Sequence, residues 1–324
     1  MKRHNVSHPN VTSDTLMKKK LKLFVLLLIF SANCLFSAGS RDSGQAITPE
    51  ELDPTLITDA ELVMKSLYEA FNDKIEKVEY RKDDWAVLMN GVWYYFSQGR
   101  LLPEKELRKA GKFRPYQFYK YPAELPPQTE ASPEEIELYL GWTNQTGAKI
   151  LSRSVSFPGT FWKASTRKET EKQIVNITFL GKNTSVHRGI QPKLKIIEEQ
   201  ILEAAKTDNT IQTWIENLDS SGGYYWRVIA KTNSRSYHSY GLAIDLLPAS
   251  LDGKQTYWLW ASKERDDWWN VPYSERYHPP EKVIKIFESY GFVWGGKWVM
   301  FDTMHFEYRP EVFILNGLPL AETP

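Results

Sequence analysis

Residues 236–245 read Ser-Tyr-His-Ser-Tyr-Gly-Leu-Ala-Ile-Asp, a pattern typical of a turn that leads into a strand. The alternation in its second half predicts a strand that turns Ala243 and Asp245 to one face and its apolar residues to a core. His238 precedes Asp245 by an odd number of positions, so the chain must bend between them for both to reach one site. Gly241 permits that bend. The stretch therefore predicts an imidazole and a carboxylate held side by side.

A second stretch adds the groups that the first one lacks. Residues 302–307 read Asp-Thr-Met-His-Phe-Glu, and the alternation predicts a strand with His305 and Glu307 on one face. Either histidine alone is explained as a hydrogen-bonded core residue, but two imidazoles and one carboxylate are the ligand set of a catalytic zinc site with one open position. We therefore expect one zinc ion per chain, bound by His238, Asp245 and His305.

Together the two stretches resemble the zinc D-alanyl-D-alanine carboxypeptidase family, whose first motif is Ser-x-His-x-x-Gly-x-Ala-x-Asp. The similarity continues through the Trp-Gly-Gly-Lys-Trp of residues 294–298 and covers roughly residues 186–310. The resemblance implies an α+β fold, with a small antiparallel sheet flanked by helices as in Hedgehog-type and D,D-peptidase domains. It also implies that the substrate is the peptide stem of peptidoglycan.

The resemblance also suggests roles for residues around the metal. Asp302 stands where the family places the general base, although the residue is Glu in the vancomycin-resistance dipeptidases and Asp in endolysin-like members. The alternative is that Asp302 caps a turn. The family arginine that holds the substrate's oxygen or carboxylate is assigned to Arg227, on an expected strand over residues 224–229, with Arg235 as the second candidate. Glu307 is expected to orient a ligand imidazole rather than to bind metal.

Three functions remain open at this point. The first is a D-alanyl-D-alanine carboxypeptidase, and the second is an endopeptidase that cuts within the stem, of the L-Ala-D-Glu type. The third is a wall-binding module that holds zinc without catalysis. Asp302 argues against the third, because a pure binder needs no base beside its metal. The sequence does not indicate an oligomeric state.

The amino terminus predicts export. A basic cluster, residues 17–22, precedes a short apolar run, residues 23–30, as in a secretory signal, so residues 1–39 are expected to be a leader and signal peptide. An uncleaved anchor is the alternative, but the run is short for a membrane span. Lipid attachment at Cys34, the only cysteine, is a second processing route. Either route leads to the cell envelope, as a periplasmic or secreted protein without a transmembrane span in the mature chain.

The charge balance argues against nucleic acid as a partner. The 324-residue chain has 41 basic and 40 acidic residues. Six of the basic residues and one of the acidic residues lie within residues 1–39. The remainder, with 35 basic and 39 acidic residues, is slightly negative, whereas phosphate binding needs a basic face.

The rest of the chain divides into three expected parts. Residues 40–125 contain a predicted helix, 59–71, and a hairpin with Asn90-Gly91 at its turn, and their role is not readable beyond packing or wall binding. A proline-rich linker is expected at residues 126–133, followed by the zinc peptidase domain at residues 134–318. Within that domain the apolar spacing predicts helices over residues 194–205, 210–217 and 281–290.

Overall fold

The computed structural model describes residues 55–143, 151–229 and 233–322. All of them belong to one compact unit, Ile47–Pro324. The expected leader, signal peptide and lipidation site lie outside the described residues. Within the described ranges, no helix combines the length and the apolar character that crossing a membrane requires.

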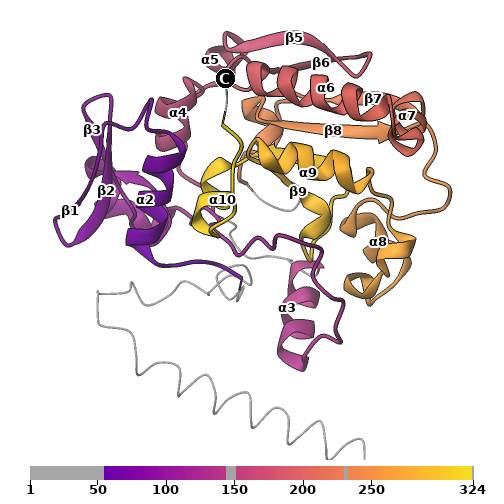
Figure 1. Cartoon of the computed structure of the whole chain (residues 1–324). Helices are drawn as coiled ribbons and strands as arrows, with labels where there is room; N and C mark the ends of the chain where they lie inside the picture. Colours follow the sequence, from indigo (N-terminus) through magenta and orange to yellow (C-terminus); the bar gives the residue numbers. More distant parts are fainter. Residues whose placement is uncertain (1–54, 144–150, 230–232, 323–324) are drawn as a thin grey trace, which may run out of the picture. The chain divides into compact units, whose positions relative to one another are not determined.

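Helices and strands mix along the chain (Figure 1). The strands are β1 Lys77–Arg81, β2 Asp84–Met89, β3 Val92–Tyr95, β4 Leu102–Pro103, β5 Ile174–Phe179, β6 Lys182–His187, β7 Leu218–Gly222, β8 Ala243–Pro248, β9 Phe292–Trp294 and β10 His305–Tyr308. The α-helices are α2 Ala60–Ala70, α3 Pro133–Thr143, α4 Ser156–Trp162, α5 Arg167–Glu171, α6 Gln191–Ala205, α7 Asn209–Glu216, α8 Trp258–Glu264, α9 Glu281–Ser289 and α10 Pro310–Leu315. The 3₁₀ helices are η3 Glu104–Lys112, η4 Tyr237–Tyr240, η5 Trp268–Asn270, η6 Tyr273–Glu275 and η7 Gly295–Lys297.

The strands pair antiparallel in three small sheets, ordered β1-β2-β3-β4, β7-β8-β10-β9 and β5-β6. The α+β class with small antiparallel sheets is therefore confirmed, while the finer assignment to a Hedgehog-type or D,D-peptidase fold stays a prediction. The sheet β7-β8-β10-β9 matters for function because it pairs Asp245 with both Gly222 and His305.

One face of this sheet is buried beneath α9. The rings of Phe306 on β10 and Phe287 on α9 stack at 4.1 Å, and Ile244 and Leu246 of β8 are buried in the same core. Burial of such side chains supplies about 1.5–3 kcal/mol each and fixes the register of the strands. As predicted, the polar residues between them, Asp245 and His305, are left to face away from this core.

The predicted local elements of the first half are confirmed. The side chain of Asp59 caps α2 by accepting a hydrogen bond from Leu62 N at 3.0 Å. The β2–β3 hairpin turns through Asn90 and Gly91, whose φ angles of 50° and 72° are those of the expected type I′ turn. The helices predicted in the second half are also present, as α6, α7 and α9.

One predicted strand is wrong. Residues 224–229 were expected to form a strand after Gly222-Gly223, but the strand there is β7, which ends at Gly222. A Cβ at Gly223 would lie 2.2 Å from Ser185 O, so this glycine marks a close crossing over β6. The chain then leaves the sheet, and only an isolated bridge between Val228 and Arg235 follows.

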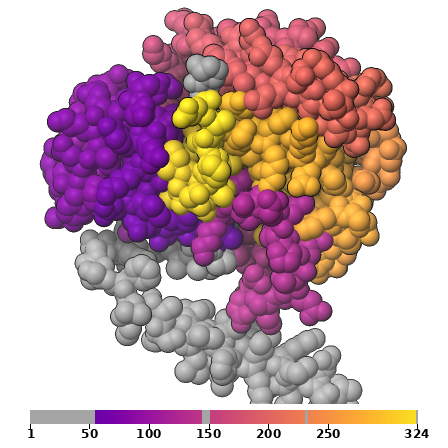
Figure 2. Space-filling view, viewed as in Figure 1, coloured from indigo at the N-terminus to yellow at the C-terminus, as the bar shows by residue number. Residues whose placement is uncertain are grey.

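The two halves of the chain share one core. Helix α2 packs against α10, and Figure 2 shows the yellow carboxyl-terminal residues directly beside the indigo amino-terminal region. The ring of Phe71, at the end of α2, lies 6.2 Å from that of Tyr308 on β10. Gln128, within the expected linker, bonds the backbone of Val271 and Tyr273 at 2.9 Å. The predicted domain boundaries stay a prediction, but this packing extends across them.

A segment that we call the strap, residues 113–121, contacts helix α9, strand β9 and helix α10 through Tyr121. The Tyr121 hydroxyl donates to Glu288 Oε1 at 2.5 Å and accepts from Trp294 N at 2.8 Å. Glu288 also forms a buried ion pair with Lys297 at 2.5 Å. The strap thus ties the amino-terminal half to helix α9 and strand β9 through buried polar contacts.

Candidate metal centre

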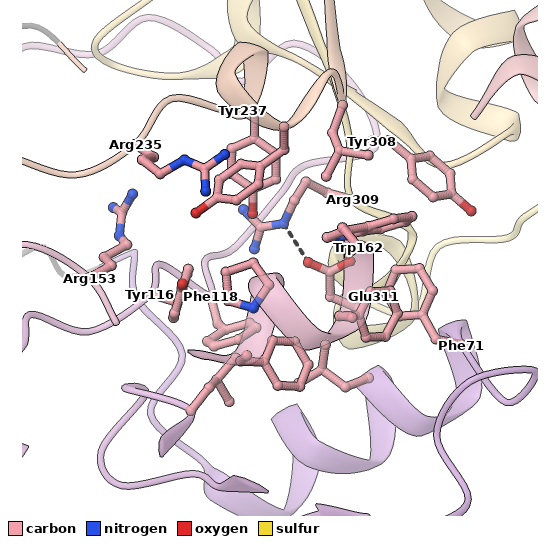
Figure 3. A pocket seen from close by; sticks show the side chains of 17 residues that line it. Phe71, Tyr116, Phe118, Arg153, Trp162, Arg235, Tyr237, Tyr308, Arg309 and Glu311 are labelled. Atoms are coloured by element: carbon pink, nitrogen blue, oxygen red, sulfur yellow. Dashed lines mark hydrogen bonds and ion pairs between the residues drawn. The ribbon is translucent and has the colours of Figure 1, made fainter. Parts of the chain in front are cut away.

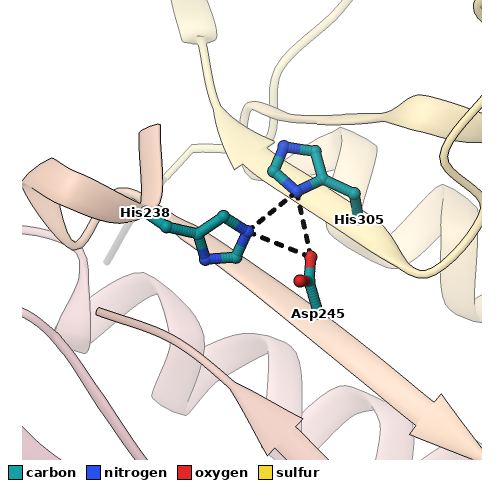
Figure 4. A group of neighbouring side chains, drawn as sticks. All are labelled: His238, Asp245 and His305. Carbon is teal, nitrogen blue, oxygen red and sulfur yellow. Dashed lines mark hydrogen bonds and ion pairs between the residues drawn. The ribbon is translucent and has the colours of Figure 1, made fainter. Parts of the chain in front are cut away.

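Three side chains from separate elements meet at the polar face of this sheet (Figure 4). His238 comes from η4, Asp245 from β8 and His305 from β10. Asp245 Oδ1 lies 3.1 Å from His238 Nε2 and 3.0 Å from His305 Nδ1, and these two nitrogens are 3.1 Å apart. The structure therefore brings together the three residues that the sequence predicted as ligands.

Gly241 produces the bend that this meeting requires. Its φ of 69° is left-handed, and a Cβ there would lie 2.7 Å from His187 N. The chain closes η4 at this residue and enters β8 two positions later. Ser236 precedes η4 and caps it, since its hydroxyl accepts from His238 N at 3.3 Å. The local sequence between residues 236 and 245 thus sets the directions in which His238 and Asp245 point.

The surroundings fix which ring nitrogen of each histidine is free. His238 Nδ1 lies 2.7 Å from Gly223 O, and His305 Nε2 lies 3.1 Å from Glu307 Oε2. Because both partners are acceptors, each of these nitrogens carries the proton, as metal-binding histidines in proteins usually do. The expected role of Glu307 thus matches its contact.

The remaining nitrogens complete a donor set that suits zinc. Nε2 of His238 and Nδ1 of His305 face one another across Asp245 Oδ1. Two lone pairs and a carboxylate at this spacing repel unless a proton or a cation lies between them. Two imidazole nitrogens and one carboxylate oxygen are a zinc donor set, so these residues fit the ion.

The charges of the centre are strongly coupled. Burial alone would lower the pKa of His305, but hydrogen bonds to Asp245 and Glu307 raise it to about 10. Burial would raise the pKa of Asp245, yet His238 and His305 hold it below its usual range. In the metal-free protein, a proton on His305 therefore occupies the place that suits a cation.

Asp302 lies beside the centre without joining the three-residue cluster. Burial, together with the negative charge of Asp245, raises its pKa to about 7, although the nearby histidines and Arg227 oppose the shift. A carboxylate that titrates near neutrality is suited to accept and return a proton. Its backbone O accepts from His305 N at 3.2 Å, so its distance from the ligand is set by the turn.

The two candidate arginines differ in their surroundings. The side chain of Arg227 is exposed, and its backbone is bonded to η4 through Ser239 Oγ at 2.9 Å. Arg235 instead lies between the rings of Trp226 and Tyr240, and it donates to Ser239 O at 2.8 Å. Arg235 is therefore held by contacts within the protein, while the side chain of Arg227 is open to solvent.

Sequence reasoning missed Tyr257, which the structure pairs with Asp302. Backbone bonds from Trp258 N to Phe301 O and from Thr303 N to Thr256 O frame the pair, at 2.9 and 2.8 Å. This is a non-hydrogen-bonded antiparallel pair, in which the two side chains share a face and lie close together. Burial, then the charge of Asp302, raises the pKa of Tyr257. No motif signals such a pairing, because the two segments are far apart in sequence.

Arg309 is a second residue that sequence reasoning missed. Its guanidinium donates to Glu307 Oε1 at 3.5 Å and to Gln117 O, in the strap, at 2.9 Å. Glu307 in turn contacts His305, so a chain of contacts links the strap to a candidate metal ligand. Its alternation with Glu307 along the chain was the only signal that could have suggested it.

Comparison with known proteins finds two family matches. Residues 230–308 match the model of a D-alanyl-D-alanine carboxypeptidase family, and this match confirms the resemblance. Residues 63–118 match a domain of unknown function (DUF8518). No curated protein and no solved structure matches the chain. The first match contains the three clustered residues and Asp302, whereas Arg227 lies just outside it.

Proposed function

We propose that this chain, with its D-alanyl-D-alanine carboxypeptidase family segment, is a zinc-dependent peptidase that hydrolyses peptidoglycan stem peptides. Its foremost activity would be removal of a terminal D-alanine. The observation that carries the proposal is the convergence of His238, Asp245 and His305, each with its ligand atom turned toward the others. We further propose that the protein acts in the cell envelope, since its substrate is located there.

The residues divide the work of hydrolysis among them. Zinc held by two imidazoles and a carboxylate supplies a Lewis acid and an activated water for attack on a carbonyl carbon. Asp302 accepts the proton that the attacking water loses and returns it to the leaving amine as the C–N bond breaks. Arg227 binds the substrate's carbonyl oxygen or carboxylate, for which its exposed guanidinium is suited.

Asp302 also separates an enzyme from a binding module. Burial and the charge of Asp245 raise the pKa of Asp302 to about 7 in the metal-free protein, and a carboxylate that titrates near neutral pH beside the candidate ligands supports the proposed proton shuttle. A bound cation lowers this pKa, so we expect activity to fall on the acid side of pH 7, as Asp302 becomes protonated.

The test uses the zinc-loaded protein, purified muropeptides and mass spectrometry of the products. Asp302→Asn and Asp302→Ala should retain zinc but lose hydrolysis by roughly a hundredfold or more. Asp219→Asn, at an exposed acid on β7 of the same sheet, is the matched control and should keep its activity. His238→Ala and His305→Ala should lose most of the metal.

The products distinguish the remaining alternatives. Release of free D-alanine supports the carboxypeptidase, and cleavage between L-alanine and D-glutamate supports the endopeptidase. If the zinc-loaded wild type cuts no stem peptide, the non-catalytic module is favoured. If both Asp302 variants keep wild-type turnover, the assignment of the base is wrong.

A further inference from the structure

A cavity of about 60 Å³ is lined by residues of the strap, of α4 and η4, and of the end of β10. The guanidinium groups of Arg153, Arg235 and Arg309 surround one end, and the rings of Phe71 and Trp162 lie at the other (Figure 3). The proposed hydrolysis does not use this cavity, although Arg235, the second candidate for the family arginine, is one of its lining residues.

Two of the three guanidiniums have donors to spare. Arginine has five N–H groups, and Arg153 uses its Nε for Pro115 O at 3.1 Å and one Nη2 proton for Gln117 Oε1 at 3.0 Å. Arg235 already donates to Ala164 O at 2.6 Å, to Thr170 Oγ1 at 3.2 Å and to Ser239 O at 2.8 Å, and its Nε is buried without a partner. Across the described ranges, neither arginine pairs with a carboxylate, whereas Arg309 pairs with both Glu307 and Glu311.

The cavity therefore has an excess of positive charge. Burial lowers the pKa of both Arg153 and Arg235, which shows that the protein itself only partly compensates their charges. Uncompensated buried charge is costly, and a bidentate carboxylate is the natural partner of a guanidinium fork. An anion at this position would relieve the cost.

The remaining walls restrict the kind of anion. Beyond the guanidiniums the lining is largely aromatic and apolar, including Phe118, Phe157 and Phe161. A volume of about 60 Å³ has room for a few waters or a small organic acid. A positively charged group on the ligand would be repelled by the three arginines.

We propose that this cavity binds a small monocarboxylate with a short apolar tail, held by Arg153 and Arg235. Propionate represents the class, and propionamide is its neutral counterpart. D-alanine adds an ammonium group to the same skeleton, and it should bind more weakly than propionate. The proposal concerns binding alone and does not depend on the proposed hydrolysis.

The experiment is calorimetric titration of the metal-free full chain at constant ionic strength, so that no metal ion competes for the carboxylate. Propionate should bind and propionamide should not. Arg153→Gln should weaken propionate binding by about tenfold or more. Arg108→Gln, at an exposed arginine of η3, should leave it unchanged.

Other outcomes overturn the proposal. Equal binding of propionamide would show that the cavity selects apolar bulk rather than charge. Weaker binding in Arg227→Gln but not in Arg153→Gln would place the carboxylate in the metal cleft. If Arg153→Gln fails to fold, Arg153→Lys retains the charge without the fork, and unchanged affinity there would rule out the guanidinium contact. Absence of propionate binding in the wild type would also refute it.

Discussion

At the scale of single residues, Glu307 and Glu311 form a natural comparison. Both are buried acids that contact Arg309, but only Glu307 also contacts His305, at 3.1 Å. The carboxylate of Glu307 fixes the ring of a proposed metal ligand and raises its basicity. Substitution of each residue in turn therefore distinguishes an effect on metal binding from an effect on the stability of the fold.

We predict that Glu307→Gln weakens zinc affinity by about 10–100-fold, because the charge that polarises His305 is lost. Glu311→Gln should change zinc affinity little, although both variants lose stability by removing a buried partner of Arg309. Zinc competition with a chelator measures the affinity, and chemical denaturation measures the stability. Equal zinc affinities in the two variants would show that Glu307 acts only through the fold.

Proton release accompanies metal binding at His305. The pKa of His305 in the metal-free protein is about 10, so zinc must displace its proton at lower pH. Between pH 8 and 9.5, above the pKa of Asp302, we predict that chelator-corrected zinc affinity rises about tenfold per pH unit. Calorimetry in buffers of different ionisation enthalpy should count about one proton released. A zinc affinity that does not change with pH in this window would show that zinc binding displaces no proton from His305.

At the scale of elements, the join between η4 and β8 sets the geometry of the site. Gly241 and Gly91 have almost the same φ, 69° and 72°, but only Gly241 has neighbours that a Cβ would strike. The nearest are Ile174 Cδ1 at 2.6 Å and His187 N at 2.7 Å. Two positions with the same backbone conformation thus differ in their packing alone.

We predict that Gly91→Ala lowers the free energy of unfolding by about 1–2 kcal/mol, the cost of a left-handed conformation with a side chain. Gly241→Ala should cost more, because the clash adds to this term, and it should also reduce bound zinc by moving His238 relative to Asp245. Denaturation curves and elemental analysis test both effects. Full zinc occupancy in Gly241→Ala would contradict this prediction, because it would show that a side chain at the bend leaves His238 and Asp245 able to bind zinc together.

At the scale of the whole molecule, the strap makes the two halves dependent on each other. Tyr121 contacts both Glu288 and Trp294, and removing its hydroxyl leaves buried groups unpaired. We predict that Tyr121→Phe lowers the free energy of unfolding by about 1–3 kcal/mol. Tyr80→Phe, at a side chain that is 62% exposed, should cost almost nothing.

The same packing predicts the behaviour of a fragment. Residues 134–318, the part expected from sequence to be the peptidase domain, lack α2 and the strap, so they expose side chains that Phe71 covers in the full chain, among them Trp162 and Tyr308. We expect this fragment to show no cooperative unfolding transition, whereas residues 47–324 unfold in one step. Independent folding of the fragment would restore the division into separate domains.

The sequence by itself determined the local features of this protein. The cap at Asp59, the turn at Asn90-Gly91 and the bend at Gly241 follow from backbone preferences of a few neighbouring residues. The ligand set His238, Asp245 and His305 was readable because its spacing is carried by two short motifs. The wrong strand at 224–229 arose because a glycine pair reads equally well as the end of a strand.

Only the tertiary structure decided which distant residues meet. The pairing of Tyr257 with Asp302 and the link from Gln117 through Arg309 to Glu307 join segments that no periodicity connects. The shared core of the two halves was hidden for the same reason. Local patterns record which face of an element is apolar, whereas the partner of that face is chosen by the packing of the whole chain.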